Sequence, residues 1–256
     1  MRMLALYCGG EGTDMAFFDP FHPQVGTKVF IPYLAYLIEH ERGLVLFDCG
    51  PHPQLAVDPR TRMGATADTY QIDVTEADLL VNQLTAQNVD PGDITHIVLS
   101  HLHYDHAGAL ECFPNATVLI QRSERDFGAH PPIYQAGDYV SADFNGQILW
   151  QELDGDHDLF GDGRLLLFPT PGHTKGHQSM LVRLDEQPVV LVGDAAPHPR
   201  TLTTRALPAV LWNPDEMVAS WDRLEQVATD NAAILIFPHD PDFRSTMKIG
   251  ADLPYT

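Results

Sequence analysis

The sequence contains few cysteines, and their spacing gives no reason to pair them. Only three of the 256 residues are cysteine, and Cys8, Cys49 and Cys112 lie far apart in the chain. An odd number of distant cysteines argues against a disulfide framework, and the lack of a C-x-x-C pair argues against a structural zinc site built from thiolates. We expect three reduced and mostly buried thiols.

Positive charge is also scarce. The chain has 15 lysines and arginines against 35 aspartates and glutamates, which gives a formal net charge of −20. Such a surface repels the phosphates of nucleic acids and anionic lipid headgroups. We therefore expect neither nucleic acid nor a membrane as a partner. Bound cations would offset part of this charge, because metal-ligating carboxylates are counted here as bare charges.

Long hydrophobic runs are missing as well. No apolar run reaches the ~20 residues that span a bilayer. Residues 1–10 carry one arginine and a short apolar stretch, without the long apolar region and small-residue cleavage site of a signal peptide. We therefore expect a cytoplasmic location. The length of 256 residues and the hydrophobic fraction of 44% suit one large globular domain or two small ones.

Short apolar runs bounded by turn residues predict many strands and a few helices. Residues 31–39 and 44–48 flank a turn and predict a hairpin. Thr75, with Asp78 three residues later, predicts a capped helix start. Asn213 followed by proline predicts a second helix that runs to about Ala228. Further strands are predicted at residues 94–100, 118–121, 165–168, 179–184, 189–192 and 234–237.

Residues 122–162 differ from the rest of the chain. They are rich in glycine, proline, aspartate and aromatic residues and lack clean periodicity. We predict long loops over a functional site, where substrate contacts often lie, and an irregular structural insert is the alternative.

Histidine is the residue that is abundant and clustered. Four of the 13 histidines fall between His96 and His106. Residues two apart in an extended segment point the same way, so His101 and His103 can meet at one metal ion. Asp105 and His106 follow in the same loop and can reach a second ion. Imidazole and carboxylate together suit zinc, iron or manganese.

Three more ligand-type side chains complete this pattern. His173, Asp194 and His239 each follow the end of an apolar run that we predict as a strand. Four ligands in one loop cannot fill two coordination shells, and these three supply the rest. The sequence therefore predicts a two-metal site built from four places in the chain.

This order of ligands, H-x-H-x-D-H and then a histidine, an aspartate and a histidine, resembles the metallo-β-lactamase superfamily. Residues 47–50 resemble the first motif of that family, and the resemblance covers nearly the whole chain. It implies a four-layer αββα sandwich of mixed α/β class, with residues 1–256 as a single domain. The closest similarity is to the quorum-quenching N-acyl homoserine lactonases. It lies in residues 100–108, 154–159, 171–179 and 193–195.

The resemblance implies a role for each ligand. The metals would be two divalent ions, zinc first, with iron, manganese or cobalt as alternatives. A hydroxide between the ions would open a lactone ring, and Asp105 would also shuttle the proton. The first ion would be bound by His101, His103 and His173, the second by Asp105, His106 and His239, and both by Asp194.

One position departs from the family pattern. Several lactonases of this type carry a tyrosine three residues after the bridging aspartate, and this chain has Pro197 there. We consider His198 or Tyr104 as a substitute for the missing phenol. Asp48 has two interpretations, an acceptor that orients a metal-bound histidine or a turn carboxylate. For His177 a structural hydrogen bond is the preferred interpretation.

The leading function is hydrolysis of a lactone, N-acyl homoserine lactones first. The apolar stretch 206–212 could hold an acyl chain or pack in the core. An esterase, thioesterase or β-lactamase on the same scaffold is the alternative. A di-iron redox protein is disfavoured because 256 residues leave no room for a flavin domain. A metal-free binding module is disfavoured because all seven ligand positions are filled. A homodimer is considered possible.

Overall fold

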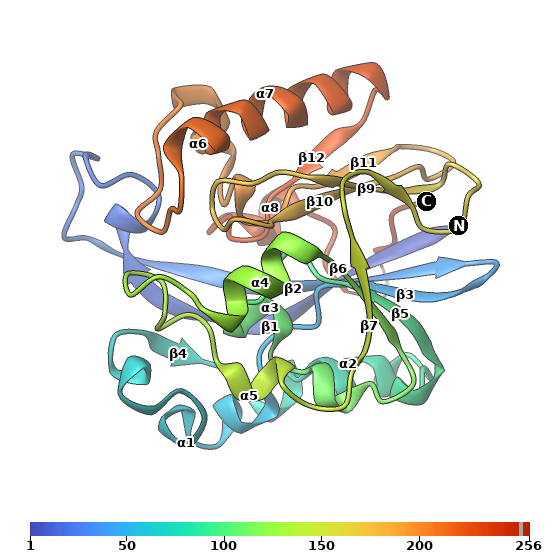
Figure 1. The fold of residues 1–256 in the computed structure, drawn as a ribbon, viewed down its shortest axis with the longest axis horizontal. Coiled ribbons are helices and arrows are strands. Elements are labelled where there is room, and N and C mark those ends of the chain that lie inside the picture. The colour runs from blue at the N-terminus through green and yellow to red at the C-terminus, as the bar shows by residue number, and fades with distance from the viewer. Residues whose placement is uncertain (251–252) are drawn as a thin grey trace.

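The computed structural model describes residues 1–250 and 253–256, which form two β-sheets packed face to face between helices (Figure 1). The first sheet has seven strands in the order β4-β1-β2-β3-β5-β6-β7. Strands β1, β2 and β3 are antiparallel, and β3, β5, β6 and β7 run parallel to one another. The strands are β1 (Arg2–Asp14), β2 (Lys28–His40), β3 (Gly43–Phe47), β4 (Gln71–Asp73), β5 (Ile94–Val98), β6 (Thr117–Gln121) and β7 (Leu149–Leu153).

The second sheet has five strands in the order β12-β11-β10-β9-β8. Strand β10 is antiparallel to both of its neighbours, and β11 pairs with β12 in parallel. The strands are β8 (His157–Asp158), β9 (Leu165–Pro169), β10 (Gln178–Val182), β11 (Val189–Leu191) and β12 (Ile234–Ile236).

Helices cover the outer face of each sheet. The longest, α7, lies over the second sheet, and α2 lies on the far side of the first sheet (Figure 1). The α-helices are α1 (Pro59–Met63), α2 (Leu80–Ala86), α3 (Tyr104–Ala107), α4 (Arg122–Ala129), α5 (Ser141–Phe144), α6 (Pro199–Thr204), α7 (Pro214–Asp230) and α8 (Phe243–Thr246). Short 3₁₀ helices are η1 (Met15–Phe17), η2 (Pro53–Ala56), η3 (Gly64–Asp68), η4 (Glu76–Asp78), η5 (Pro91–Asp93), η6 (Leu110–Cys112) and η7 (Gly193–Ala195).

Three hydrophobic clusters fill the spaces between the four layers. Side chains alternate along a strand, so β1 sends Leu4 and Leu6 toward the α2 side and Met3 and Ala5 toward the second sheet. The third cluster packs Trp221 and its neighbours on α7 against the second sheet. The layers are therefore helix, sheet, sheet and helix, and the predicted αββα sandwich is confirmed.

The predicted strands and helices are present with small shifts at their ends. The hairpin closes where His40 pairs with Gly43. Thr75 forms the predicted capping box with Asp78, but this box opens the short 3₁₀ helix η4, and α2 begins separately after Leu79. The side chain of Asn213 accepts hydrogen bonds from two backbone N–H groups at the start of α7. These local signals were sufficient because each depends on residues close together in sequence.

The prediction of long loops over residues 122–162 was only partly right: residues 130–140 form no helix or strand and contact the predicted ligand His173 through Gln135, but much of the segment is regular. The segment contains α4, α5, β7 and β8. Helix α4 has eight residues, and its buried side includes the carboxylate of Glu124 beside Phe127 and Gly128. With Phe127 as its only large buried apolar side chain, this short polar helix has too few apolar residues for its periodicity to be recognised in the sequence. Strand β1 was not predicted, because its glycines break the apolar run and the β1–β2 register shifts between Tyr7 and Gly10.

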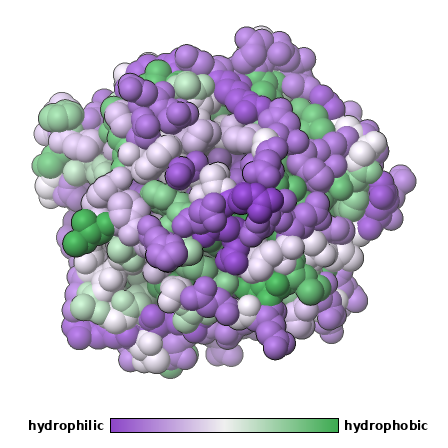
Figure 2. All heavy atoms as spheres, viewed as in Figure 1, coloured by the Kyte–Doolittle hydropathy of each residue, from purple (hydrophilic) through white to green (hydrophobic). Residues whose placement is uncertain are grey.

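The surface agrees with the composition. Figure 2 shows hydrophilic residues over most of one face, with hydrophobic residues in small patches. Among the described residues, no helix combines the length and the apolar character needed to cross a membrane.

Candidate metal centre

The seven predicted ligands come from four segments that follow strand ends. His101 and His103 follow β5, and Asp105 and His106 lie one turn further on, in α3. The other three lie in the connection from β9 to β10, in η7 after β11, and beyond the end of β12. In both sheets the ligands lie just beyond the C-terminal ends of strands, where loops can present polar groups. In the order of these three positions, the ligands are His173 between β9 and β10, Asp194 in η7 and His239 beyond β12.

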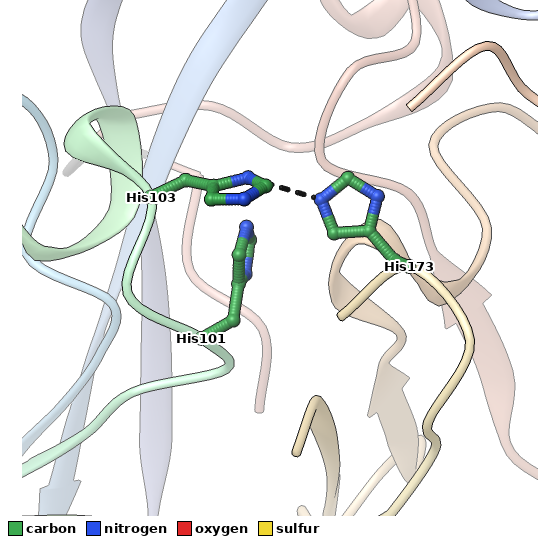
Figure 3. A group of neighbouring side chains, drawn as sticks. All are labelled: His101, His103 and His173. Atoms are coloured by element: carbon green, nitrogen blue, oxygen red, sulfur yellow. Dashed lines mark hydrogen bonds between the residues drawn. The ribbon is translucent and has the colours of Figure 1, made fainter. Parts of the chain in front are cut away.

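The first group of ligands consists of three imidazoles. Ligand nitrogens of His101, His103 and His173 all lie within 4.8 Å of one another. Figure 3 shows the three rings converging, two from the loop after β5 and one from the loop after β9. His103 Nδ1 and His173 Nε2 are 3.1 Å apart. This spacing allows one ion to be reached by all three rings.

The second group joins Asp105, His106 and His239, again with ligand atoms within 4.8 Å. Asp194 lies between the two groups. Its Oδ2 is 3.4 Å from His173 Nε2, and its Oδ1 is 3.2 Å from His106 Nε2 and 3.1 Å from His239 Nε2. One oxygen thus faces each group, which is the arrangement that a bridging carboxylate needs.

In four of the histidines an oxygen atom outside the centre contacts Nδ1, which leaves Nε2 directed into the centre. Such contacts fix the ring orientation and tautomer of metal-binding histidines. The acceptor is close in each case. The contacts are His101 with Ser100 Oγ at 2.9 Å, His106 with Asp48 Oδ2 at 2.8 Å, His173 with the carbonyl of Val210 at 3.1 Å, and His239 with the carbonyl of Pro32 at 2.8 Å.

The buried polar atoms of the centre fit metal ions. Among the described residues, Nε2 of His101 and His106 and Oδ1 of Asp194 are buried in this centre without a hydrogen-bond partner. Buried polar atoms without partners are costly and therefore rare. Burial also lowers the pKa of His101 and His103 well below the usual range, which favours the neutral imidazole that binds metals. The donor set is that of a two-metal centre.

Asp48 lies directly behind the second group. Besides His106, it accepts hydrogen bonds from the backbone N–H of Ser100 at 2.7 Å and from Ser100 Oγ at 2.9 Å. Its backbone has φ of 57°, a left-handed conformation that non-glycine residues rarely adopt. The structure thus places Asp48 as an acceptor that orients His106, and its effect on metal binding stays a prediction.

Gly193 fixes the neighbouring Asp194. Its φ is +56°, and a Cβ there would lie 2.5 Å from His177 Nε2. His177 is buried, its Nδ1 lies 2.9 Å from Thr170 Oγ1, and its ring is 5.4 Å from that of His101. His177 therefore supports the centre from outside the two ligand groups.

The structure does not bring His198 to the centre. A cavity at the ligands is lined by five of the seven, and also by Tyr104. His198 lines a different cavity of about 290 Å³ that shares no lining residue with it. Its Nδ1 accepts a hydrogen bond from Arg200 N at the start of α6, and its ring packs on Phe18. The suggested catalytic role of His198 has no geometric support.

Tyr104, the other suggested substitute, faces the ligand cavity but its hydroxyl is engaged. It donates to Glu11 Oε2 at 2.5 Å, and Tyr33 donates to the same oxygen at 2.7 Å. Burial raises the pKa of Glu11 to about 7, although the two phenols lower it. Glu11 was not predicted from the sequence, because it lies in the unpredicted strand β1.

Glu124 is a second carboxylate that sequence reasoning missed. It is fully buried and accepts four hydrogen bonds. Burial raises its pKa, against the lowering by these donors. The donors are Leu102 N at 3.2 Å, Tyr139 Oη at 2.9 Å, Thr174 Oγ1 at 2.7 Å and Gly176 N at 3.0 Å.

Tyr70 and Asp138 complete the polar lining of the ligand cavity. The Tyr70 hydroxyl donates to Asp138 Oδ1. Burial raises the pKa of Asp138 to about 6, and the hydrogen bond from Tyr70 lowers it. Their segments are 68 residues apart, so no local pattern in the sequence could have paired them.

Core packing is shown for part of the apolar stretch 206–212, and its role in holding an acyl chain stays a prediction. Leu207 and Leu211 pack against the core under α7, and Val210 lines the ligand cavity.

This fold and this donor set define a class of metal-dependent hydrolases. The Metallo-beta-lactamase superfamily is matched by residues 30–239, which include all seven ligands, so the chain belongs to this superfamily.

Its relatives within the superfamily share one activity by name. The chain is 38% identical over 229 residues to the N-acyl homoserine lactonase AttM of Azorhizobium caulinodans, with 87% of each chain covered. It is 29% identical over 226 residues to the N-acyl homoserine lactonase AiiA of Bacillus thuringiensis, with 88% of this chain and 87% of the relative covered.

A solved structure agrees with these sequence relatives. It is an N-acyl homoserine lactone hydrolase with the product N-hexanoyl-L-homoserine bound at its catalytic metal centre. It matches this chain with a TM-score of 0.87 at 25% identity, covering 97% of this chain and 96% of its own.

Proposed function

We propose that this chain hydrolyses the lactone ring of N-acyl homoserine lactones at a centre of two divalent metal ions, and that zinc is the preferred metal. The observation that carries the proposal is the placement of Asp194, with one carboxylate oxygen toward each of two ligand groups. The named activity of the relatives supplies the substrate class.

The ligand assignment follows the two groups. His101, His103 and His173 would hold one ion, and Asp105, His106 and His239 would hold the other, with Asp194 placed to contact both. Divalent ions held by these residues would supply an activated water at neutral pH and would polarise a carbonyl oxygen. The chain needs no serine or cysteine nucleophile for this chemistry.

The residues of the chain then handle the proton. Asp105 Oδ2 is 3.3 Å from His106 Nε2 and 3.6 Å from His239 Nε2, at the edge of the cavity. From this place its carboxylate can accept a proton from the attacking water and deliver it to the ring oxygen as the ring opens. Apolar side chains of Phe17 and Val210 border the same cavity and limit the access of bulk water.

A substrate panel tests this proposal. Purified, metal-loaded protein is offered N-hexanoyl homoserine lactone, an aryl ester, a thioester and a β-lactam, and acid release is followed with a pH indicator. We expect the lactone to be opened with the highest kcat/KM. If the protein hydrolyses the thioester or the β-lactam but not the lactone, the proposed substrate class is wrong. The assignment as a metal-dependent hydrolase would still hold.

A further inference from the structure

Asp138 and Tyr70 form a polar pair at the ligand cavity that the proposed hydrolysis does not use. Both line this cavity together with Asp105, Asp194 and His239. The Tyr70 hydroxyl donates to Asp138 Oδ1. The Tyr70 ring packs near the Tyr104 ring, with centroids 5.6 Å apart. The pair joins the segment before β4 to the segment before α5.

The position of Asp138 is tied to both ligand loops. Its carbonyl accepts a hydrogen bond from Tyr104 N at 3.0 Å, next to the ligands His103 and Asp105. Its N–H donates at 3.0 Å to the carbonyl of Gln135, whose side chain in turn donates to the carbonyl of His173 at 2.7 Å. The Asp138 carboxylate is therefore held at a fixed place relative to the centre.

One carboxylate oxygen of Asp138 is free to bind a ligand. Oδ1 accepts from Tyr70, and the hydrogen bonds of the described residues give Oδ2 no donor. The residue is 9% exposed, and Oδ2 is not among the fully buried atoms without a partner. Because Asp138 lines the cavity, this oxygen is an accessible acceptor for a donor that enters with the substrate. The matching chemistry is an N–H or O–H group and not an anion, since Asp105 and Asp194 already border the cavity.

Glu11, the other carboxylate at this cavity, is placed less well for such a group. It is 2% exposed and lies under the hydroxyls of Tyr33 and Tyr104, which donate to it. A group that enters with the substrate meets the more exposed Asp138 first.

We infer that Asp138 Oδ2 binds the amide N–H that an N-acyl amino lactone carries on the carbon next to its ring carbonyl. When this carbonyl lies at the ligand centre, the nitrogen of the N–H group is two bonds from the carbonyl carbon, toward the wall of the cavity. Asp138 is then a specificity-determining residue, and Tyr70 is a positioning residue that keeps the carboxylate from turning. The inference rests on the proposed function.

A pair of substrates isolates this contact. N-hexanoyl homoserine lactone and α-hexanoyloxy-γ-butyrolactone have nearly the same shape, but the second carries an ester oxygen in place of the N–H. Ring opening of each is followed by chromatography of the product. We expect the unaltered protein to prefer the amide by about tenfold or more in kcat/KM, because a site built around a hydrogen bond discriminates against an analogue that lacks the donor.

The variants decide which residue gives this preference. Asp138→Asn keeps the shape and replaces an acceptor oxygen by N–H₂, so we expect it to remove the preference by slowing the amide substrate alone. Tyr70→Phe should reduce the preference in the same direction and by less. Glu11→Gln, the matched carboxylate-to-amide change in the same cavity, should alter both substrates by the same factor. Metal content and Tm are measured for each variant.

Several results would overturn the inference. One is an unaltered protein that opens both lactones equally fast, and another is an Asp138→Asn variant that loses both activities equally with its metal retained. If Asp138→Asn does not fold, an unchanged preference in Tyr70→Phe contradicts the inference instead. Failure of the unaltered protein on both lactones would refute the proposed function itself, which separates the two cases.

Discussion

Asp105 has two tasks at the centre, because the same carboxylate that faces His106 and His239 also borders the cavity. Asp105→Asn keeps one oxygen for a metal ion and loses the ability to take a proton. We expect kcat to fall by about 10²-fold or more, the range of general acid–base catalysis, while metal content falls much less. Elemental analysis beside steady-state kinetics measures both, and equal losses would remove the shuttle role.

His198 provides the opposite case. It caps the start of α6 and lines a cavity away from the ligands. We expect His198→Ala to leave kcat within about twofold and to lower the free energy of unfolding by about 1 kcal/mol, the usual effect of losing an N-cap. Denaturant unfolding with parallel kinetics checks this. A large fall in kcat with unchanged metal content would restore the catalytic role considered from the sequence.

At the scale of residues, the sequence predicted the side chains whose residue type and position are typical of metal ligands. His101 and Asp194 stand out because each follows an apolar run, and the structure brings them together. Glu11, Glu124 and Asp138 gave no such signal, because a carboxylate is usually solvated and only the tertiary fold reveals that these are buried.

The helix α4 connects the two ligand loops of the first group through Glu124. Its Oε1 accepts from Leu102, between His101 and His103, and its Oε2 accepts from Thr174, next to His173. Glu124 thus sets the distance between the segments that must converge on one ion.

Glu124→Gln replaces an acceptor oxygen by a donor that faces other donors. We expect the free energy of unfolding to fall by about 1–3 kcal/mol, and one metal ion to be lost more readily to a chelator than the other. Asp126→Asn, on the exposed side of the same helix, is the control and should stay within about 0.5 kcal/mol. Metal retention after graded chelation gives the readout. Simultaneous loss of both ions at one chelator concentration would contradict a specific role for the first group.

At the scale of elements, prediction followed local pattern. The hairpin at His40 and the caps at Thr75 and Asn213 were found because their signals span a few residues. Helix α4 was missed because it is short and strongly polar, and Phe127 is the only large apolar side chain on its buried side. The two packed sheets came only from the family resemblance, and the order of their strands was not predicted, since strand pairing depends on contacts between distant segments.

The whole molecule brings five imidazoles and two carboxylates together beyond the ends of strands from both sheets. Without cations, several of these buried polar atoms have no hydrogen-bond partner. Bound metal should therefore stabilise the folded protein. We expect chelation to lower Tm by roughly 5–10 °C, which corresponds to about 2.7 kcal/mol at a metal concentration of 100 times Kd. Differential scanning calorimetry before chelation, after it and after zinc is restored measures the effect. An unchanged Tm in the stripped protein would argue against a metal-stabilised centre.

The predicted fold class and superfamily are confirmed at this scale. A single domain over residues 1–256, a cytoplasmic location and a homodimer stay predictions. The first requires limited proteolysis, the second requires localisation in the cell, and the third requires a measurement of mass in solution, because none of them follows from the fold of one chain.

The central claim is that lactone hydrolysis requires two metal ions held by these seven side chains. The most direct measurement is a titration of zinc into stripped protein, with opening of N-hexanoyl homoserine lactone followed at each step. The account predicts that activity reaches its plateau at two ions per chain and that His239→Ala cannot be restored by adding zinc up to that ratio. Full activity with one ion per chain, or with none, would contradict it.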